Sequence, residues 1–194
     1  MPAVQPTPLT PEAHPDDAQW VVRAQGGEDF AFDMLYRRHV QFVAAVAVRL
    51  GQRSDVDDLV QETFITAFRE LKQLTQPAAF RGWLARITVS KVHRRRRFWR
   101  VFRFFRDEAD ERATLESMVS SEASPEVRAQ LGRVDTAVSR LPEPIRAAWV
   151  LRFVLGCTLE EVATGCSCSL ATAKRRLTSA SNIVNQVVTV EMPE

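Results

Sequence analysis

Apolar residues recur at intervals of three and four along most of this 194-residue chain, whereas signals for β-strands are weak. This spacing puts the apolar side chains of each segment on one face of an α-helix, and that face must be buried against other helices. The sequence therefore predicts an all-α fold. The first expected helices run from residue 16 or 17 to 25, from 30 to 50, from 54 to 71 and from 80 into a run of arginines.

The apolar stripes of these helices define the expected core of a compact first domain, residues 16–106. The second helix is expected to bury Phe32, Leu35, Tyr36, His39, Phe42, Val43 and Val46. The third is expected to bury Val56, Leu59, Val60, Phe64, Ala67, Phe68 and Leu71. In the fourth, Leu84 and Ile87 are expected in the core, and Trp83 is equally compatible with the core and with a binding surface.

The third of these helices carries four acids and no base between Ser54, its expected N-cap, and Phe68. Acids in a first helical turn can simply complement the helix dipole, which accounts for Asp55, Asp57 and Asp58. Gln61, Glu62 and Ile65 lie beyond the reach of the dipole, and docking on a basic partner accounts for the whole face. The candidate docking residues are Asp57, Asp58, Gln61, Glu62 and Ile65.

Charge is segregated along the chain, although the net charge is only +2. Residues 81–106 contain ten Lys or Arg and no acid, whereas residues 107–126 contain seven acids and one Arg. We interpret residues 107–130 as an acidic flexible linker, in part a loose helix. The first 15 residues are rich in proline and are expected to form a disordered tail.

Aromatic residues are interleaved with cations in the basic segment, a combination that suits single-stranded or distorted DNA. The candidate residues are Phe80, Arg81, Trp83, Arg86, Ser90, Lys91, Arg94 and Arg95. Two alternatives remain: the aromatics are core residues and the arginines a solvated face, or the segment lies on a membrane surface. The membrane alternative is the weaker because the aromatics from Phe98 to Phe105 do not share one face.

The C-terminal part, residues 131–190, is expected to form a second helical domain, punctuated by Pro142 and Pro144. Thr158 and Glu161 form a capping box, a tight GCSC segment follows, and Ser169 caps a second short helix. This is the pattern of a helix-turn-helix, whose second helix enters the major groove; an ordinary helical hairpin is the alternative. The candidate DNA-contacting residues are Ser169, Thr172, Lys174, Arg175 and Arg176.

Other classes of protein find little support in the sequence. No apolar run approaches the roughly 18 residues of a membrane helix, and the N-terminus lacks the pattern of a signal peptide, so a cytoplasmic location is expected. Cys157, Cys166 and Cys168 do not have the spacing of a structural zinc site, and burial in a compact turn explains them better. No cofactor, metal or catalytic activity is expected, since no nucleophile–base pair or phosphate loop is recognisable.

Two segments resemble a known family. DVDDLVQETFITAF followed by FRGWLARI resembles conserved region 2 of bacterial sigma factors of the extracytoplasmic-function group, and LPEPIRAAWVLRFVLGCTLEEVATGCSCSLATAKRRL is similar to region 4. The resemblance covers residues 17–105 and 131–185, most of the chain. It implies a promoter-specificity subunit, with region 2 in residues 16–106 and region 4 in residues 131–190.

The resemblance also implies partners and roles. The acidic helix would bind the β′ clamp helices of core RNA polymerase, the basic helix would melt and hold the −10 element, and the helix-turn-helix would read the −35 element as duplex. The acidic linker would thread toward the active-site cleft and RNA exit channel, and the β subunit is a further expected contact in core polymerase. An anti-sigma factor that holds the protein inactive until a stress signal arrives is a further expected partner.

Some positions depart from the family pattern. Ser90 stands where many relatives have Asn, LTQPAA replaces a Phe-Asp-Gly-rich loop before Phe80, and Ser167 takes the place of the usual turn glycine. After Leu177 the sequence TSASNIV lacks the usual basic residues, which predicts fewer phosphate contacts. Ser90 and the shortened basic tail leave one alternative open, an adaptor that titrates an anti-sigma factor without initiating transcription. A second alternative is a stand-alone helix-turn-helix regulator, which would need no acidic docking helix.

Overall fold

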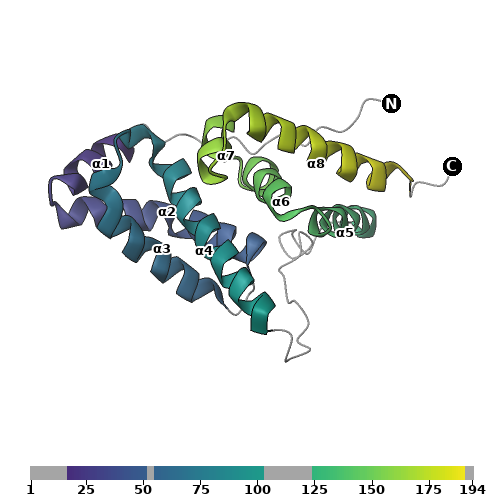
Figure 1. The fold of residues 1–194 in the computed structure, drawn as a ribbon, viewed down its shortest axis with the longest axis horizontal. Helices are drawn as coiled ribbons and strands as arrows, with labels where there is room; N and C mark the ends of the chain where they lie inside the picture. The colour runs from purple at the N-terminus through teal and green to yellow at the C-terminus, as the bar shows by residue number, and fades with distance from the viewer. Residues whose placement is uncertain (1–16, 52–54, 103–123, 191–194) are drawn as a thin grey trace.

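The structure is a computed structural model that describes residues 17–51, 55–102 and 124–190, and within these ranges every regular element is helical (Figure 1). The predicted all-α fold is confirmed. The first four helices are α1 (Asp17–Gln25), α2 (Asp29–Leu50), α3 (Val56–Glu70) and α4 (Phe80–Phe102). Two short 3₁₀ turns, η2 (Leu71–Gln73) and η3 (Pro77–Ala79), join α3 to α4. The predicted tail, the proposed cap Ser54 and most of the predicted linker lie outside the described residues.

The second half contains α5 (Pro125–Ser139), α6 (Glu143–Trp149), the π-helical turn η6 (Val150–Val154), α7 (Leu159–Gly165) and α8 (Leu170–Val190). Two expectations for these elements were wrong. The second domain, expected from residue 131 after the linker, already opens with a helix at Pro125, because proline is well tolerated in a first turn and Ser124 caps the helix by accepting a hydrogen bond from Val127 N. The helix after Ser169 is not short, because Ala180 and Val184 keep its apolar face buried.

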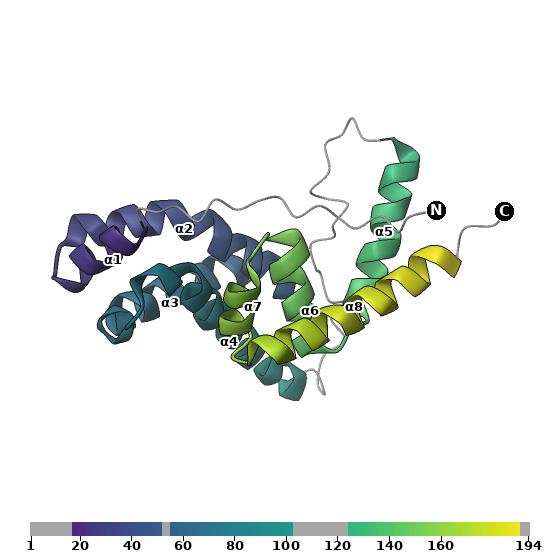
Figure 2. The ribbon, with the colours of Figure 1, turned by 90° about the horizontal axis from the view of Figure 1, so that it is seen from above.

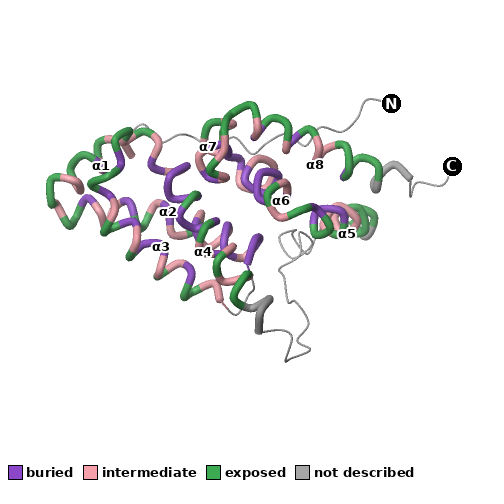
Figure 3. The backbone as a smooth tube through the Cα atoms, in the orientation of Figure 1, coloured by how far each residue is buried: buried purple, intermediate pink, exposed green. Residues whose placement is uncertain are grey.

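Two apolar clusters make up the core (Figure 3). One lies within the first four helices, where Phe80 and Leu84 are fully buried. The other runs without a break from Val46, Leu59 and Val89 in the first half to Leu151 in the second. The two helical units therefore share a core in this conformation, and Figure 2 shows α7 lying beside α4 where they meet.

Two residues expected in the core are at the surface. Tyr36 is 39% exposed and Phe68 is 57% exposed. Each ring packs edge-on against another aromatic, Tyr36 on Phe64 at 4.6 Å and Phe68 on Phe32 at 5.0 Å between ring centroids. The reason is geometric: the apolar stripes of α2 and α3 are wider than the face that each helix buries, so their outer edges remain exposed.

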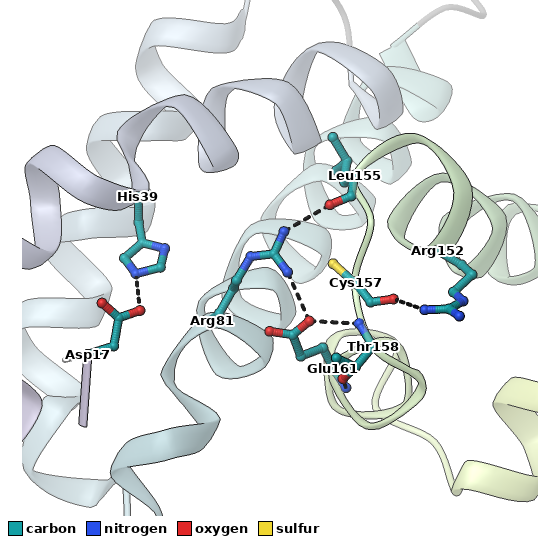
Figure 4. A network of polar contacts seen from close by, with 8 residues as sticks. All are labelled: Asp17, His39, Arg81, Arg152, Leu155, Cys157, Thr158 and Glu161. Carbon is teal, nitrogen blue, oxygen red and sulfur yellow. Dashed lines mark hydrogen bonds and ion pairs between the residues drawn. The ribbon is translucent and has the colours of Figure 1, made fainter. Parts of the chain in front are cut away.

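A polar contact ties α1 to α2 beneath this core. The Asp17 carboxylate lies 2.7 Å from His39 Nε2 (Figure 4) and 3.2 Å from Arg38 Nη1. His39, which was expected in the core, is buried there against the ring of Phe80. Burial opposes ionisation of Asp17, but the hydrogen bonds from His39 and Arg38 outweigh it and lower the pKa of the Asp17 carboxyl.

Replacing Asp17 with Asn should lower the free energy of unfolding by about 2 kcal/mol at pH 7, because it removes a carboxylate from a largely buried network. Since folding lowers the pKa of Asp17, its contribution is complete above the unfolded value of about 3.9 and is lost as the pH falls through the lower folded value. Urea unfolding as a function of pH measures both effects. The matched control is Asp33→Asn, which breaks an exposed pair with Arg37 and should cost no more than about 0.5 kcal/mol; equal losses for the two variants would contradict the prediction.

Candidate functional site

The acidic face of α3 lies directly beside the basic helix α4. Glu62 accepts a hydrogen bond from Arg95 Nη2 at 2.7 Å, and its carboxylate is also within 3.7 Å of Lys91 Nζ and 3.8 Å of Arg94 Nη2. Asp58 lies 3.7 Å from Arg95 Nη1. The two charged helices, expected to serve different partners, therefore partly neutralise each other, and Glu62 orients three cations of α4.

The rest of the α3 face borders a groove of about 700 Å³ between α2 and α3. Its lining residues are Phe32, Tyr36, Val40, Ala44, Asp57, Val60, Gln61, Phe64, Ile65, Phe68 and Arg69. Asp57 and Gln61 are exposed polar residues of this groove, and Ile65 is 44% exposed. The α2 wall of this groove was not expected from the sequence; the signal for it was an apolar stripe too wide for one buried face.

The predicted DNA-contacting residues of α4 fall into three environments. Phe80 and Trp83 are 0% and 5% exposed, so in this conformation both are core residues. Lys91 and Arg95 lie against Glu62, and Arg81 points toward α7. The exposed members of the predicted set are Arg86, Ser90 and Arg94.

Arg81 connects the two helical units (Figure 4). Its guanidinium donates to Glu161 Oε2 at 2.9 Å and to the carbonyl oxygen of Leu155 at 2.8 Å, and it lies over the ring of Phe42 at 4.4 Å from the centroid. The same Glu161 oxygen accepts a hydrogen bond from Thr158 N at 2.8 Å. One carboxylate thus caps α7 and holds α4, and the predicted capping box is confirmed.

Small residues let α4 and α7 approach closely, and this pair makes the most extensive helix–helix contact in the described chain. A Cβ atom on Gly82 would lie 3.1 Å from Glu161 Cα, and one on Gly165 would lie 2.9 Å from Leu151 Cδ1 and 3.2 Å from Ala85 Cβ. A larger side chain at either glycine would have to push the two helices apart.

Helices α7 and α8 form the predicted helix-turn-helix. Ser169 Oγ accepts a hydrogen bond from Thr172 N at 3.2 Å and so caps α8, as the sequence predicted, while Ala173 and Leu177 are buried. Lys174 and Arg175 are exposed. The other two predicted contact residues, Thr172 and Arg176, are half-buried. The turn between the helices holds Ser167 at φ 49°, a left-handed conformation that costs a serine more than a glycine.

Cys166 and Cys168 lie in this turn, and Cys157 lies just before α7. Cys157 is fully buried, and burial raises its pKa to about 12; burial also raises the pKa of Cys166 to about 11. Thiols with such pKa values are poor nucleophiles at neutral pH. Within the described ranges, no cluster of three or more His, Cys, Asp or Glu side chains is arranged to hold a metal ion. Nor is any helix there long and apolar enough to cross a membrane.

Sequence comparisons identify relatives of this chain. Residues 35–100 match the family model for sigma-70 region 2. The RNA polymerase sigma factor NccH of Alcaligenes xylosoxydans xylosoxydans is 34% identical over 81% of this chain and 87% of its own length. The sigma factor CnrH of Cupriavidus metallidurans is 31% identical over 84% and 91%. The extracytoplasmic-function sigma-E factor of Escherichia coli is 30% identical over 89% and 94%.

Solved structures agree with this assignment. The structure of CnrH in complex with the cytosolic domain of CnrY matches with a TM-score of 0.67 and 25% identity, covering 91% of this chain and 99% of CnrH. The sigma factor RpoE bound to the anti-sigma factor NepR from Bartonella quintana shares the fold, with a TM-score of 0.64 at 20% identity over 85% and 99%. The chain belongs to the extracytoplasmic-function sigma factors, which are transcription initiation factors of RNA polymerase.

The Arg81–Glu161 contact should show strong energetic coupling. We expect a double-mutant cycle with Arg81→Ala and Glu161→Gln, measured by urea unfolding, to give a coupling free energy of about 1–3 kcal/mol. Glutamine at position 161 can still accept the hydrogen bond that caps α7, so the cycle isolates the charge pair. The exposed Arg23–Glu28 pair, with the same residue types, should give less than about 1 kcal/mol. Coupling at Arg81 no larger than this would contradict the prediction.

Ser167→Gly should stabilise the chain by about 1 kcal/mol, because glycine adopts the left-handed turn conformation without steric cost. Thermal or urea unfolding measures this gain. Ser181→Gly, in the interior of α8, is the control and should instead lower stability by about 0.5 kcal/mol. A loss of stability at both positions would mean that the turn does not strain Ser167.

Proposed function

We propose that this sigma factor docks on core RNA polymerase through the groove between α2 and α3, with Gln61 and Ile65 at the centre of the contact. The observation that carries this proposal is the combination of an apolar groove of about 700 Å³ with exposed polar groups at Asp57 and Gln61. Apolar side chains in such a groove supply affinity, while the acidic side chain selects a basic partner such as the β′ clamp helices. The β subunit, which is also an expected partner, would be contacted in the same complex with core polymerase.

Glu62 has a second role in this proposal. Because it lies against Lys91, Arg94 and Arg95, part of its charge is already balanced within the chain. Asp58 keeps a side chain that is 71% exposed and contributes to the field that attracts a basic surface. Docking therefore depends less on Glu62 than the sequence suggested, and substitution of Glu62 would disturb the DNA-facing helix as well.

The DNA contacts fall on α4 and α8. We assign the −10 element to the exposed side of α4, where Arg86, Ser90 and Arg94 lie, and the −35 element to α8, where Lys174 and Arg175 are exposed. Arginines suit phosphate contacts, and the N-terminal residues of a recognition helix suit base edges in the major groove. Arg81 joins the −10 contacts only when the contact with Glu161 opens.

The proposed organisation follows from these assignments. Region 2 comprises residues 17–102, region 4 comprises residues 124–190, and the acidic segment between them is the linker. The solved relatives were captured with the cytosolic domain of CnrY and with the anti-sigma factor NepR. This supports an anti-sigma partner for the present chain, and transcription initiation places its action in the cytoplasm. The protein itself carries out no catalysis.

Ile65→Arg should weaken binding to core RNA polymerase at least tenfold, because it replaces an apolar groove residue with a charge that a basic partner repels. Fluorescence anisotropy with labelled protein and purified core enzyme measures the affinity. The control is Val22→Arg on α1, an exposed valine outside the groove at 56% exposure against 44% for Ile65, which should change affinity less than twofold.

Transcription with purified components completes the test. Start sites produced by wild-type protein with core polymerase on its own genomic DNA identify the promoters, and Ile65→Arg should abolish them while Val22→Arg does not. Unchanged polymerase binding by Ile65→Arg would refute the docking site. Polymerase binding by the wild type without any initiation would favour an adaptor that titrates an anti-sigma factor.

A further inference from the structure

Another polar contact joins the two halves of the chain, about 18 Å along α4 from Arg81. Here Glu143, the first residue of α6, meets two side chains of α4. Its Oε1 atom lies 3.7 Å from His93 Nε2 and 3.8 Å from Arg96 Nη1. His93 follows Val92, which is 1% exposed and belongs to the core that the two halves share. The imidazole therefore borders the surface that the halves bury against each other.

The charged groups around His93 come from two helices. Helix α6 presents the Glu143 carboxylate, and α4 itself presents the Arg96 guanidinium one turn further along. Helix α2 presents the carbonyl oxygen of Leu50, which accepts a hydrogen bond from Arg96 Nη1 at 3.4 Å. Helix α7 packs on the start of α4, away from His93. The acids before and on α3 lie against a different cation, Arg95; they are Asp55, Asp58 and Glu62.

The closed arrangement disfavours a positive charge on His93. Burial and the neighbouring Arg96 oppose protonation, whereas Glu143 favours it, and burial is the largest of these effects. The pKa of His93 therefore lies below its ordinary value of 6.5. Arg96 belongs to the same helix and stays beside His93 when the halves separate, but the cover that α6 provides is then lost. The open chain therefore takes up a proton on His93 more readily than the closed chain.

We propose that His93 is a pH-sensitive latch between the two halves, closed while its imidazole is neutral and released when acid protonates it. A protonated His93 adds a second cation beside Arg96 in front of a single carboxylate. At 3.7 Å, Glu143 Oε1 is too far from His93 Nε2 for a hydrogen bond that would offset the lost hydration of an imidazolium. The proposal concerns the free chain and does not rest on the polymerase or DNA contacts proposed above.

The pH range of the latch follows from the direction of the shift. Well above the ordinary histidine value of about 6.5, the imidazole is neutral in both forms and the contact contributes fully to the closed form. As the pH falls through that value, the open form gains a proton that the closed form resists. The loss is complete once the pH lies below the lower pKa that His93 has in the closed form.

Small-angle X-ray scattering of the full chain between pH 8 and pH 5.5 measures the opening, because separation of the halves raises the radius of gyration. Arg81→Gln weakens the other polar contact of the junction and brings the open form into a measurable range. In this background the ratio of open to closed chain should rise about threefold as the pH falls. Proton NMR of the histidine rings identifies which imidazole titrates over the same range.

Three variants in the same background make the result specific. His93→Gln takes up no proton, so the chain should stay closed at pH 5.5. His93→Arg carries a permanent charge, so the chain should be as open at pH 8 as at pH 5.5. His39→Gln removes an imidazole that lies wholly within the first half, and it should keep the threefold change. Circular dichroism melting checks that each variant stays folded.

Three results would overturn the proposal. A radius of gyration independent of pH, in the wild type and in Arg81→Gln alike, would show that acid does not open the junction. A pH dependence that persists in His93→Gln would assign the opening to another group. Closure on acidification would show that attraction to Glu143 outweighs the burial of the charged imidazole.

Discussion

The close packing of α4 on α7 is the constraint on which the rest of the structure depends. Gly82 and Gly165 let the helix backbones meet, and the Arg81 guanidinium reaches both Glu161 and the carbonyl of Leu155. Glu161 also forms the capping box of α7. The same carboxylate therefore joins the two halves of the chain and caps the first helix of the helix-turn-helix. The core that runs between the halves follows from this approach. Opening the two halves would expose that core and release Arg81 together.

A second internal contact changes the interpretation of the two charged helices. From the sequence, α3 and α4 are expected to bind two different partners. In the structure Glu62 orients Lys91, Arg94 and Arg95, so the acidic helix helps to shape the basic one. Because these charges are already partly paired, less desolvation free energy has to be overcome when either helix binds a partner. In the docking mode proposed above, the contact surface therefore shifts from the acids themselves to the apolar groove beside them, where Ile65 and Phe68 lie.

Local signals predicted local structure well. The capping box of Thr158 and Glu161 and the cap at Ser169 each depend on residues close together in the chain, and each has the expected place. The sequence could not predict that Arg81 would meet Glu161, because eighty residues separate them and no spacing rule connects them. Nor could the sequence predict which residues of one apolar stripe are buried: Phe64 and Phe68 share the periodicity of α3, but Phe64 is buried and Phe68 lies at the surface.

Helix α4 contacts the core, α7 and α3 at once, and this limits which of its positions can change during evolution. A substitution at Phe80, Gly82 or Glu62 would alter the core, the approach of α7 or the orientation of the basic residues, so selection for folding restricts these positions. The exposed residues Arg86 and Ser90 of the same helix carry no such burden. Under the function proposed above, duplicated copies of the gene can therefore acquire new promoter preferences by exchanging Ser90, while the scaffold that holds it stays the same.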